Sequence, residues 1–305
     1  MESNNKTVVV TGASGLLGRA VLKRFEEAGW KATGLAFSRA HKHPNLVKLD
    51  ITDQEAVKHF LVSTRPEVIV HCAAEKSPDV VEKQPEEARK LNADATRNLA
   101  LCAVQVKAFF IYISTDSVFD GKNPPYAEDA TTSPLNKYGH SKRDGEVSTI
   151  NLNAGVVLRI PFLYGPVDEL AESSVAILFG QVKAGKPVTI SHYDYRRPAH
   201  VDDIAGVVLL LAEKKLASVQ GEQIYGIYHW SGPDQMTKYE MALIMADLFK
   251  LPKDHIKADP NAPTSGAPRA VDPSLSCERL QKLGAPTPVD FRTGVVPVLQ
   301  PFLNA

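Results

Sequence analysis

The chain has 305 residues, 44% of them hydrophobic and 23% charged, which is ordinary for a globular protein with an ample core. Its 35 basic and 35 acidic side chains cancel, which excludes a global field that would recruit nucleic acid or an anionic membrane. The 3 cysteines have no metal-type spacing, and their odd, sparse number favours a reducing compartment, so we expect no metal site. Because Met1–Lys6 lacks the apolar run of a signal peptide, we expect a cytoplasmic protein.

Apolar runs of strand length alternate with helical patterns through the first half of the chain. The runs are rich in Val and Ile, as strands buried on both faces should be. The predicted strands are Thr7–Gly12, Lys31–Phe37, Val68–Ala74, Phe109–Thr115 and Gly155–Pro161, and the predicted helices are Leu16–Ala28, Gln54–Thr64 and Glu86–Val106. This alternation predicts an α/β fold, a Rossmann-type doubly wound parallel sheet with right-handed crossovers.

After Pro161 the alternation loosens, and Pro252–Pro288 is rich in proline and predicted to be loop. The expected elements there are helices over 173–186, 201–215 and 237–250 and strands over 187–191 and 223–232. The helix over 201–215 is amphipathic and could return to the main sheet. We therefore predict a main domain over 1–160, completed by parts of 200–230, and a smaller, discontinuous lobe over 161–305 that closes over the strand ends.

The first predicted strand runs directly into Thr11–Gly18, with the sequence TGASGLLG. Gly12, Gly15 and Gly18 allow a tight turn, close backbone approach to a pyrophosphate and close packing of helix on strand. The helix N-terminus adds positive potential. A glycine pattern in this setting, after a strand and before a helix, predicts a dinucleotide-binding turn.

The end of the second strand distinguishes the two nicotinamide cofactors. An acidic residue there would bind the ribose 2′-hydroxyl, whereas a basic residue accommodates a 2′-phosphate. The chain has Phe37, Ser38 and Arg39 at this point and no carboxylate before Asp50, which favours NADP over NAD. The alternative is that Arg39 is merely solvated. Asp50 could contact the adenine or cap a helix, and the two interpretations are equally supported.

Tyr138 and Lys142 are 4 residues apart in a segment that could begin a helix, so they would share a face. A hydride delivered to a carbonyl carbon leaves an alkoxide that needs a proton, and a tyrosine beside an ammonium can supply one. The same hydroxyl and ammonium can hold a cofactor ribose without any catalysis. The sequence leaves both interpretations open.

Several motifs, in their order along the chain, resemble the extended short-chain dehydrogenase/reductase superfamily: TGxxGxxG, HCAAE, STDSVFDG, YGHSK and RRPAHVDDIA. The resemblance covers nearly the whole chain. Within it, ISTDSVFDG and LRIPFLYG look like the dTDP-4-dehydrorhamnose reductase branch. The segments VIVHCAAEKSPDVVEKQP and HWSGPDQMTKYEMA are similar to the family of regulatory β subunits of methionine adenosyltransferase.

The resemblance implies roles for individual residues. Thr115, Tyr138 and Lys142 match the catalytic set of the superfamily, and Asn92 matches its structural or proton-relay asparagine. The implied cofactor-binding residues are Gly12, Ser14, Gly15, Leu16, Leu17, Gly18, Phe37, Ser38, Arg39, Asp50, Cys72, Lys76, Asn92, Tyr138, Lys142 and Leu163.

The implied substrate side holds Ser117 and Arg197. The reductase branch usually has an aromatic residue where this chain has Ser117, and that difference puts recognition of a sugar nucleotide in doubt. Arg197 could bind a substrate anion or form an ion pair with Asp202 or Asp203. His200, His229 and Trp230 could line the pocket, but core or loop positions are expected for the two histidines.

Two functions follow from the resemblance. The first is an NADP(H)-binding regulatory subunit that associates with the catalytic subunit of methionine adenosyltransferase, in S-adenosylmethionine synthesis. The alternative is an active NADPH-dependent reductase of the dTDP-4-dehydrorhamnose reductase type. Members of the β-subunit family extend past the equivalent of PFLNA with a basic and aromatic tail, whereas this sequence stops at Ala305, so a weaker, different or absent interaction is a further expectation.

Overall fold

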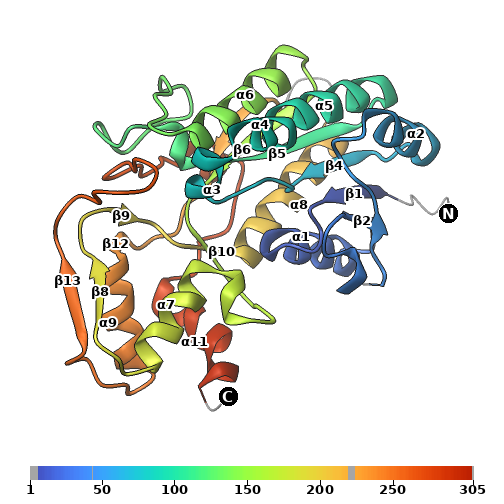
Figure 1. Cartoon of the computed structure of the whole chain (residues 1–305). Helices are drawn as coiled ribbons and strands as arrows, with labels where there is room; N and C mark the ends of the chain where they lie inside the picture. Colours follow the sequence, from blue (N-terminus) through green and yellow to red (C-terminus); the bar gives the residue numbers. More distant parts are fainter. Residues whose placement is uncertain (1–5, 43, 219–223, 304–305) are drawn as a thin grey trace.

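The computed structural model describes residues 6–42, 44–218 and 224–303. Its central sheet has seven parallel strands in the order β11, β6, β5, β4, β1, β2, β3 (Figure 1). Their bounds are β1 Thr7–Thr11, β2 Lys31–Ala36, β3 Val47–Lys48, β4 Val68–His71, β5 Phe109–Thr115, β6 Gly155–Ile160 and β11 Gly226–His229. The predicted Rossmann-type α/β fold is confirmed. Of the predicted strand over 223–232, Gln223 lies outside the described residues.

Helices cover both faces of this sheet (Figure 1). One face carries α1 (Leu16–Glu27) and α8 (Val201–Ala217), and the other carries α2 (Gln54–Thr64), α5 (Ala95–Val106) and α6 (Lys137–Asn151). The prediction that the helix at 201–215 returns to the main sheet is confirmed. No helix of the described ranges is long and apolar enough to cross a bilayer.

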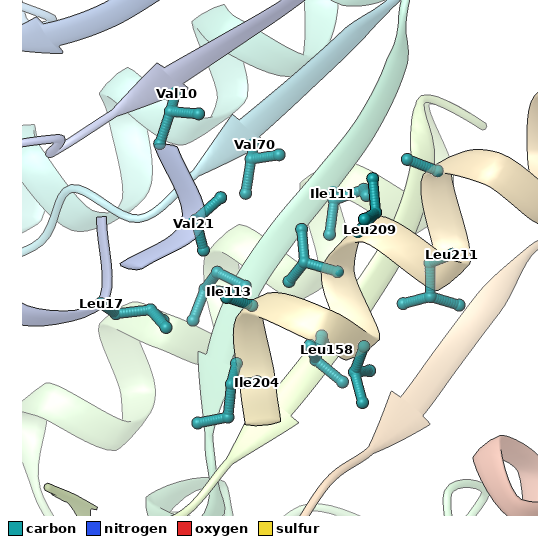
Figure 2. Packing of buried hydrophobic residues seen from close by; sticks show 14 of the residues in the cluster. Val10, Leu17, Val21, Val70, Ile111, Ile113, Leu158, Ile204, Leu209 and Leu211 are labelled. Carbon is teal, nitrogen blue, oxygen red and sulfur yellow. The ribbon is translucent and has the colours of Figure 1, made fainter. Parts of the chain in front are cut away.

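Strand residues alternate between the two apolar cores, as the two-residue period of a strand requires. Val8 and Val10 pack toward α1 and α8, whereas Val9 packs toward α2 and α5. In Figure 2, Val10 and Val70 of the sheet lie beside Val21 of α1, within the cluster that α8 completes. These interlocked side chains hold the carboxyl ends of the strands at one edge, where ligands of such sheets bind.

The predicted helix Glu86–Val106 is present, but it is not α-helical throughout. It consists of α4 (Pro85–Arg89), a π turn over Lys90–Asp94 and α5, and the short helix α3 (Pro78–Lys83) precedes it. A π turn inserts one extra residue into the helix. The spacing of apolar residues in the sequence does not reveal such an insertion. Asn92 lies in this turn.

A second apolar core lies beyond the sheet, among α7 (Ser174–Lys183), α9 (Lys238–Leu248) and α11 (Phe291–Leu299). Three short strand pairs accompany it: β8 (Val188–Ser191) with β13 (Ile256–Asp259), β7 (Leu163–Tyr164) with β10 (Ala199–His200), and β9 (Tyr195–Arg196) with β12 (Met236–Thr237). Figure 1 shows α9, β8 and β13 side by side at one end of the molecule.

The prediction that Pro252–Pro288 is loop is wrong in part, because the segment contains β13 and α10 (Glu278–Lys282). Both elements are short, and β13 exposes Lys257 and Ala258, so its apolar pattern is weak. Helix α11 was not predicted at all. It carries Gly294 and Pro297 in its interior, two residues with low helix propensity.

Candidate functional site

The glycine turn between β1 and α1 is shaped by close backbone contacts. Gly12 has a φ of 67°, and a Cβ there would lie 2.7 Å from the backbone nitrogen of Ala73. A Cβ at Gly18 would overlap the carbonyl oxygen of Gly12. Helix α1 begins after Gly15 without a side-chain cap. The N–H groups of its first turn therefore stay available to an anion, as a dinucleotide-binding turn requires.

The predicted residues of this turn are close together and mostly buried. Ser14, Leu16 and Leu17 are each less than 10% exposed. Backbone groups, rather than these side chains, are what a ligand would meet at the turn.

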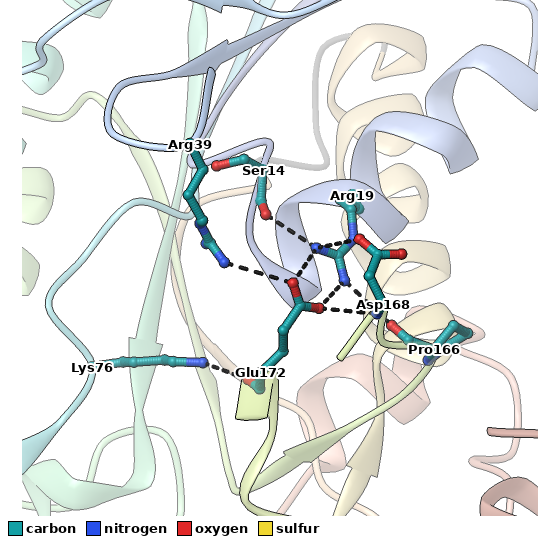
Figure 3. A network of polar contacts seen from close by, with 7 residues as sticks. All are labelled: Ser14, Arg19, Arg39, Lys76, Pro166, Asp168 and Glu172. Atoms are coloured by element: carbon teal, nitrogen blue, oxygen red, sulfur yellow. Dashed lines mark hydrogen bonds and ion pairs between the residues drawn. The ribbon is translucent and has the colours of Figure 1, made fainter. Parts of the chain in front are cut away.

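Cationic side chains surround the turn (Figure 3). A Cβ on Gly15 would lie 3.6 Å from Nη2 of Arg39, so this guanidinium stands over the turn rather than pointing away into solvent. Lys76 approaches from the loop after β4, and its pKa is lowered by burial and by the nearby Arg39. Arg19 donates from Nη1 to the Ser14 carbonyl oxygen at 3.1 Å. These positive groups fit the phosphates of a dinucleotide.

Sequence reasoning missed Arg19 and its partner Glu172. The Nη2 of Arg19 donates to Oε2 of Glu172 at 2.6 Å, and Nη1 of Arg39 lies 3.9 Å from Oε1 of the same carboxylate. Arg19 directly follows Gly18, so its place in the first turn of α1 could have marked it. Glu172 is more than 150 residues from Arg19 and no sequence pattern connects the two.

Phe37 and Ser38 line a surface pocket of about 340 Å³ at the end of β2, together with Lys48. The Phe37 ring is 53% exposed, and Nζ of Lys48 lies 5.9 Å from its centroid. An exposed aromatic ring beside a cation offers a flat surface on which a base could stack.

Asp50 is not a helix cap, so that interpretation is wrong. Its Oδ1 accepts hydrogen bonds from the backbone N–H and the hydroxyl of Thr52, at 2.9 and 2.7 Å, within a turn. The cap of α2 is Asp53, which accepts from the N–H of Ala56 at 3.0 Å. Adenine contact remains the prediction for Asp50.

Asn92 joins the loop after β4 to α6. Its Oδ1 accepts from the N–H of Glu75 at 2.8 Å, and its Nδ2 donates to the Glu75 carbonyl oxygen at 3.0 Å and to Oγ of Ser141 at 3.1 Å. These three hydrogen bonds hold the loop after β4 against α6. In the same loop, burial raises the pKa of the Cys72 thiol to about 12, against a lowering effect of Lys142.

Tyr138 and Thr115 meet because α6 begins very close to the end of β5. Asn136 caps the helix by accepting from the N–H of Gly139 at 2.8 Å. A Cβ on Gly139 would overlap the carbonyl oxygen of Ser117, so only glycine permits this approach. The Thr115 hydroxyl donates to Oδ1 of Asp116 at 3.1 Å, and its closeness to the Tyr138 hydroxyl counteracts the rise in the Tyr138 pKa that burial causes.

Lys142 lies one helical turn beyond Tyr138 and is 4% exposed. Its Nζ lies 4.3 Å from the ring centroid of Tyr112. Burial lowers the pKa of Lys142 to about 7, and the Glu146 carboxylate opposes that shift. The structure thus brings the predicted Thr115, Tyr138 and Lys142 together, in an arrangement that can orient a carbonyl oxygen and donate a proton to it.

Of the two predicted substrate residues, Arg197 lines a narrow space beside Asp116, whereas Ser117 is not among the residues that line it. Ser117 donates from Oγ to Oδ1 of Asp116 at 3.3 Å, and burial raises the pKa of the Asp116 carboxyl. Arg197 donates from Nε to Oγ of Ser274 at 3.1 Å and from Nη1 to the Pro233 carbonyl oxygen at 2.8 Å. Of the two interpretations of Arg197, the ion pair with Asp202 or Asp203 is wrong, because Asp203 instead accepts from the backbone N–H of Val289 at 2.9 Å. Binding of a substrate anion stays a prediction.

The space itself is narrow. Asp116, Arg196, Arg197 and Ser274 are among the residues that line it, and the volume open to a water molecule there is about 0 Å³. A substrate could enter this space only if these side chains moved.

The remaining predicted residues lie away from this space. His229 is 0% exposed and contacts Nη1 of Arg159 at 3.2 Å, and burial lowers its pKa to about 3. His200 caps α8 by accepting from the N–H of Asp202 at 3.2 Å. His229 occupies the expected core position, whereas His200 ends β10 and caps α8 and so is neither a core nor a loop residue. Trp230 is 2% exposed. Leu163 pairs with Ala199 between β7 and β10, at the end of β6.

Comparison with known proteins agrees with this geometry. The family described as the RmlD substrate binding domain matches residues 6–304. Methionine adenosyltransferase 2 subunit beta of Xenopus laevis is 47% identical over 301 residues, which cover 98% of this chain and 89% of that protein. The chain belongs to the RmlD family, in the branch of these β subunits.

Two reductase relatives are less similar to this chain than the Xenopus laevis β subunit is. A probable dTDP-4,6-dihydroxy-2-methyloxan-3-one 4-ketoreductase of Streptomyces antibioticus is 30% identical over 298 residues, which cover 94% of this chain and 92% of that protein. The dTDP-4-dehydrorhamnose reductase of Bacillus anthracis, solved in complex with NADP, is 25% identical with a TM-score of 0.84, over 99% of this chain and 100% of that chain. The predicted resemblance to both groups is confirmed.

Proposed function

We propose that this protein is an NADP-binding regulatory β subunit of a methionine adenosyltransferase, the enzyme class that makes S-adenosylmethionine. One observation carries the proposal: identity to the β subunit of Xenopus laevis is 47%, against 30% to the Streptomyces antibioticus ketoreductase, over nearly the same length of chain. The difference extends over the whole protein rather than one motif.

The cofactor site supports NADP. A Cβ at Gly12 or Gly18 would collide with the backbone of Ala73 or of Gly12, so the turn needs glycine at both positions, and Arg19, Arg39 and Lys76 supply positive charge around it. When bound, the cofactor supplies or accepts a hydride. The residues proposed to hold it are Gly12, Ser14, Gly15, Leu16, Leu17, Gly18, Phe37, Ser38, Arg39, Asp50, Cys72, Lys76, Asn92, Tyr138, Lys142 and Leu163.

We further propose that the two parts of the chain have different functions. Residues 1–160, with parts of 200–230, would hold the cofactor, and the lobe over 161–305 would serve a substrate or the catalytic subunit. The separate apolar core of α7, α9 and α11 supports this division, because it gives the lobe packing of its own.

Association with the catalytic subunit is tested by mixing the purified protein with methionine adenosyltransferase from its host at micromolar concentrations, with and without NADP. The two proteins should elute together from a size-exclusion column. Separate elution under both conditions would contradict the proposal.

The second candidate is an NADPH-dependent reductase, which the contact of Thr115 with Tyr138 and the neighbouring Lys142 supports. In such a reaction the carbonyl carbon takes a hydride and Tyr138 gives its proton to the oxygen. The assay is NADPH oxidation with dTDP-4-dehydro sugars, comparing wild type with Tyr138→Phe. Turnover that the substitution abolishes would favour the reductase, whereas no turnover by wild type would exclude it for these substrates.

A further inference from the structure

A short segment after β7 crosses the glycine turn and places a carboxylate among its cations (Figure 3). The segment runs from Pro166 to Glu172 and ends in a single 3-10 turn over Leu170–Glu172. Glu172 leaves only 17% of its side chain exposed, although it belongs to a surface loop. Its position is therefore defined by specific contacts rather than by solvation.

Glu172 contacts three cationic residues, Arg19, Arg39 and Lys76, and the backbone of its own segment. Arg19 donates from Nη2 to Oε2 at 2.6 Å and from Nη1 to Oε1 at 3.3 Å, which is the forked pairing that guanidinium groups make with carboxylates and phosphates alike. Nη1 of Arg39 lies 3.9 Å from Oε1. Lys76 donates from Nζ to the Glu172 carbonyl oxygen at 3.1 Å. The N–H of Asp168 donates to Oε2 at 3.3 Å, which closes the segment on itself.

These same cations are the ones that a phosphate entering the glycine turn would meet. Arg19 also bonds the carbonyl oxygen of Ser14, and Arg39 stands over Gly15, so both guanidinium groups are anchored at the turn. Each phosphate of the pyrophosphate bridge carries one negative charge, as the carboxylate does, and the 2′-phosphate of NADP is a monoester that carries about 1.5 to 2 at pH 7. Glu172 and a cofactor phosphate cannot both take the forked donors of Arg19.

We propose that Glu172 is an internal competitor for the phosphate-binding arginines, and that dinucleotide binding releases the segment Pro166–Glu172 from the glycine turn. The inference rests on the proposed binding of NADP and names how that site is regulated. The free energy of NADP binding is then the difference between the free energies of two sets of ion pairs. One set forms within the free protein, and the other forms between the protein and the cofactor.

Release of the segment would reach the smaller lobe directly. Ser173, the next residue, caps α7 by accepting from the N–H of Ala176 at 3.2 Å. On the other side, Leu170 belongs to the apolar cluster that contains α7. One segment therefore joins the cofactor turn to the first helix of the lobe that we propose for partner binding.

The test compares NADP titrations of wild type, Glu172→Gln and Asp168→Asn by calorimetry. Asp168 is a matched control, because its carboxylate lies on the same segment and loses the same charge but is 69% exposed and 3.8 Å from Arg19. Charge-assisted hydrogen bonds contribute about 1.5–3 kcal/mol, so Glu172→Gln should bind NADP on the order of tenfold more tightly. Asp168→Asn should change the affinity less than about twofold.

A second measurement needs no variant. Hydrogen exchange of the backbone amides from Asp168 to Ser173 in the wild-type protein should become faster when NADP saturates the site. Equal or weaker binding by Glu172→Gln, or unchanged exchange in the segment, would overturn the competitor role while leaving NADP binding intact. If wild type does not bind NADP at all, the proposed cofactor and the competitor role both fail.

Discussion

Burial and a neighbouring carboxylate shift the pKa of Lys142 in opposite directions. Lys142 is 4% exposed between the Tyr112 ring and the end of β4, and burial lowers its pKa from 10.5 to about 7. Glu146, one turn further along α6, acts in the other direction but is itself bonded by Arg159 at 2.7 Å. The Lys142 ammonium is therefore only partly stabilised in the free protein, and a bound anion would complete its surroundings.

This balance predicts proton uptake on cofactor binding. Because the pKa of Lys142 is about 7 in the free protein, the amine is neutral in most molecules at about pH 8. A bound anionic dinucleotide raises that pKa. NADP binding near that pH should take up as much as about one proton. Calorimetry in two buffers of different ionisation enthalpy measures the uptake, and Lys142→Met should remove it. Proton release by wild type would contradict the assignment.

Arg39 carries the expected preference for NADP over NAD. Replacing it with alanine removes charge-assisted hydrogen bonds of about 1.5–3 kcal/mol to a 2′-phosphate, so NADP affinity should fall roughly tenfold to a hundredfold. NAD lacks that phosphate and shares only the pyrophosphate, so its affinity should fall less than that of NADP. Arg24→Ala, an exposed arginine of α1, is the matched control. Unchanged NADP affinity of Arg39→Ala in parallel titrations would refute the assignment.

At the scale of elements, small residues on α6 decide where the site can form. Gly139 allows the helix to start against the carbonyl oxygen of Ser117, and a Cβ on Gly145 would collide with the Tyr112 hydroxyl. The Tyr112 hydroxyl donates to the Lys142 carbonyl oxygen at 3.3 Å. Because Tyr112 lies in β5 and Lys142 in α6, this hydrogen bond helps to set the distance between the helix and the strand. The spacing of Tyr138 and Lys142 becomes a site only because these contacts hold the helix close.

Two helical glycines should respond in opposite ways to alanine. Gly145→Ala should lower the free energy of unfolding by about 1–3 kcal/mol, because the added methyl group overpacks the contact with Tyr112. Gly206→Ala in α8 meets no atom within 4 Å and should raise it by about 0.5–1 kcal/mol, because alanine favours the helix. Chemical denaturation of the three proteins measures both effects. A destabilised Gly206→Ala or a stabilised Gly145→Ala would contradict this account of the packing.

The sequence predicted those elements whose signals are local. Alternating apolar runs gave the buried strands, and the glycine turn gave the start of α1. The π turn at Asn92 and helix α11 were missed, because an inserted residue and an internal proline do not appear in an apolar period. Thr115, Tyr138 and Lys142 were found through their motifs, whereas Glu172 reaches the site only through long-range folding.

At the scale of the whole molecule, one cofactor site joins two apolar cores. The main core lies between the sheet and α1 with α8, and the second core contains α7, α9 and α11. The glycine turn lies at the edge of the sheet, and the second core gives the smaller lobe packing of its own. The molecule thus has two separately packed parts, which is what the proposed division between cofactor binding and partner binding requires.

The most direct test of the central claim follows both reactions in one mixture. The purified protein is added to a methionine adenosyltransferase catalytic subunit with methionine, ATP and NADPH, and both S-adenosylmethionine formation and NADPH absorbance are recorded. Our account predicts that the protein changes the KM or rate of S-adenosylmethionine formation while NADPH is not consumed. Unchanged kinetics at saturating protein, with no complex formed, would contradict it.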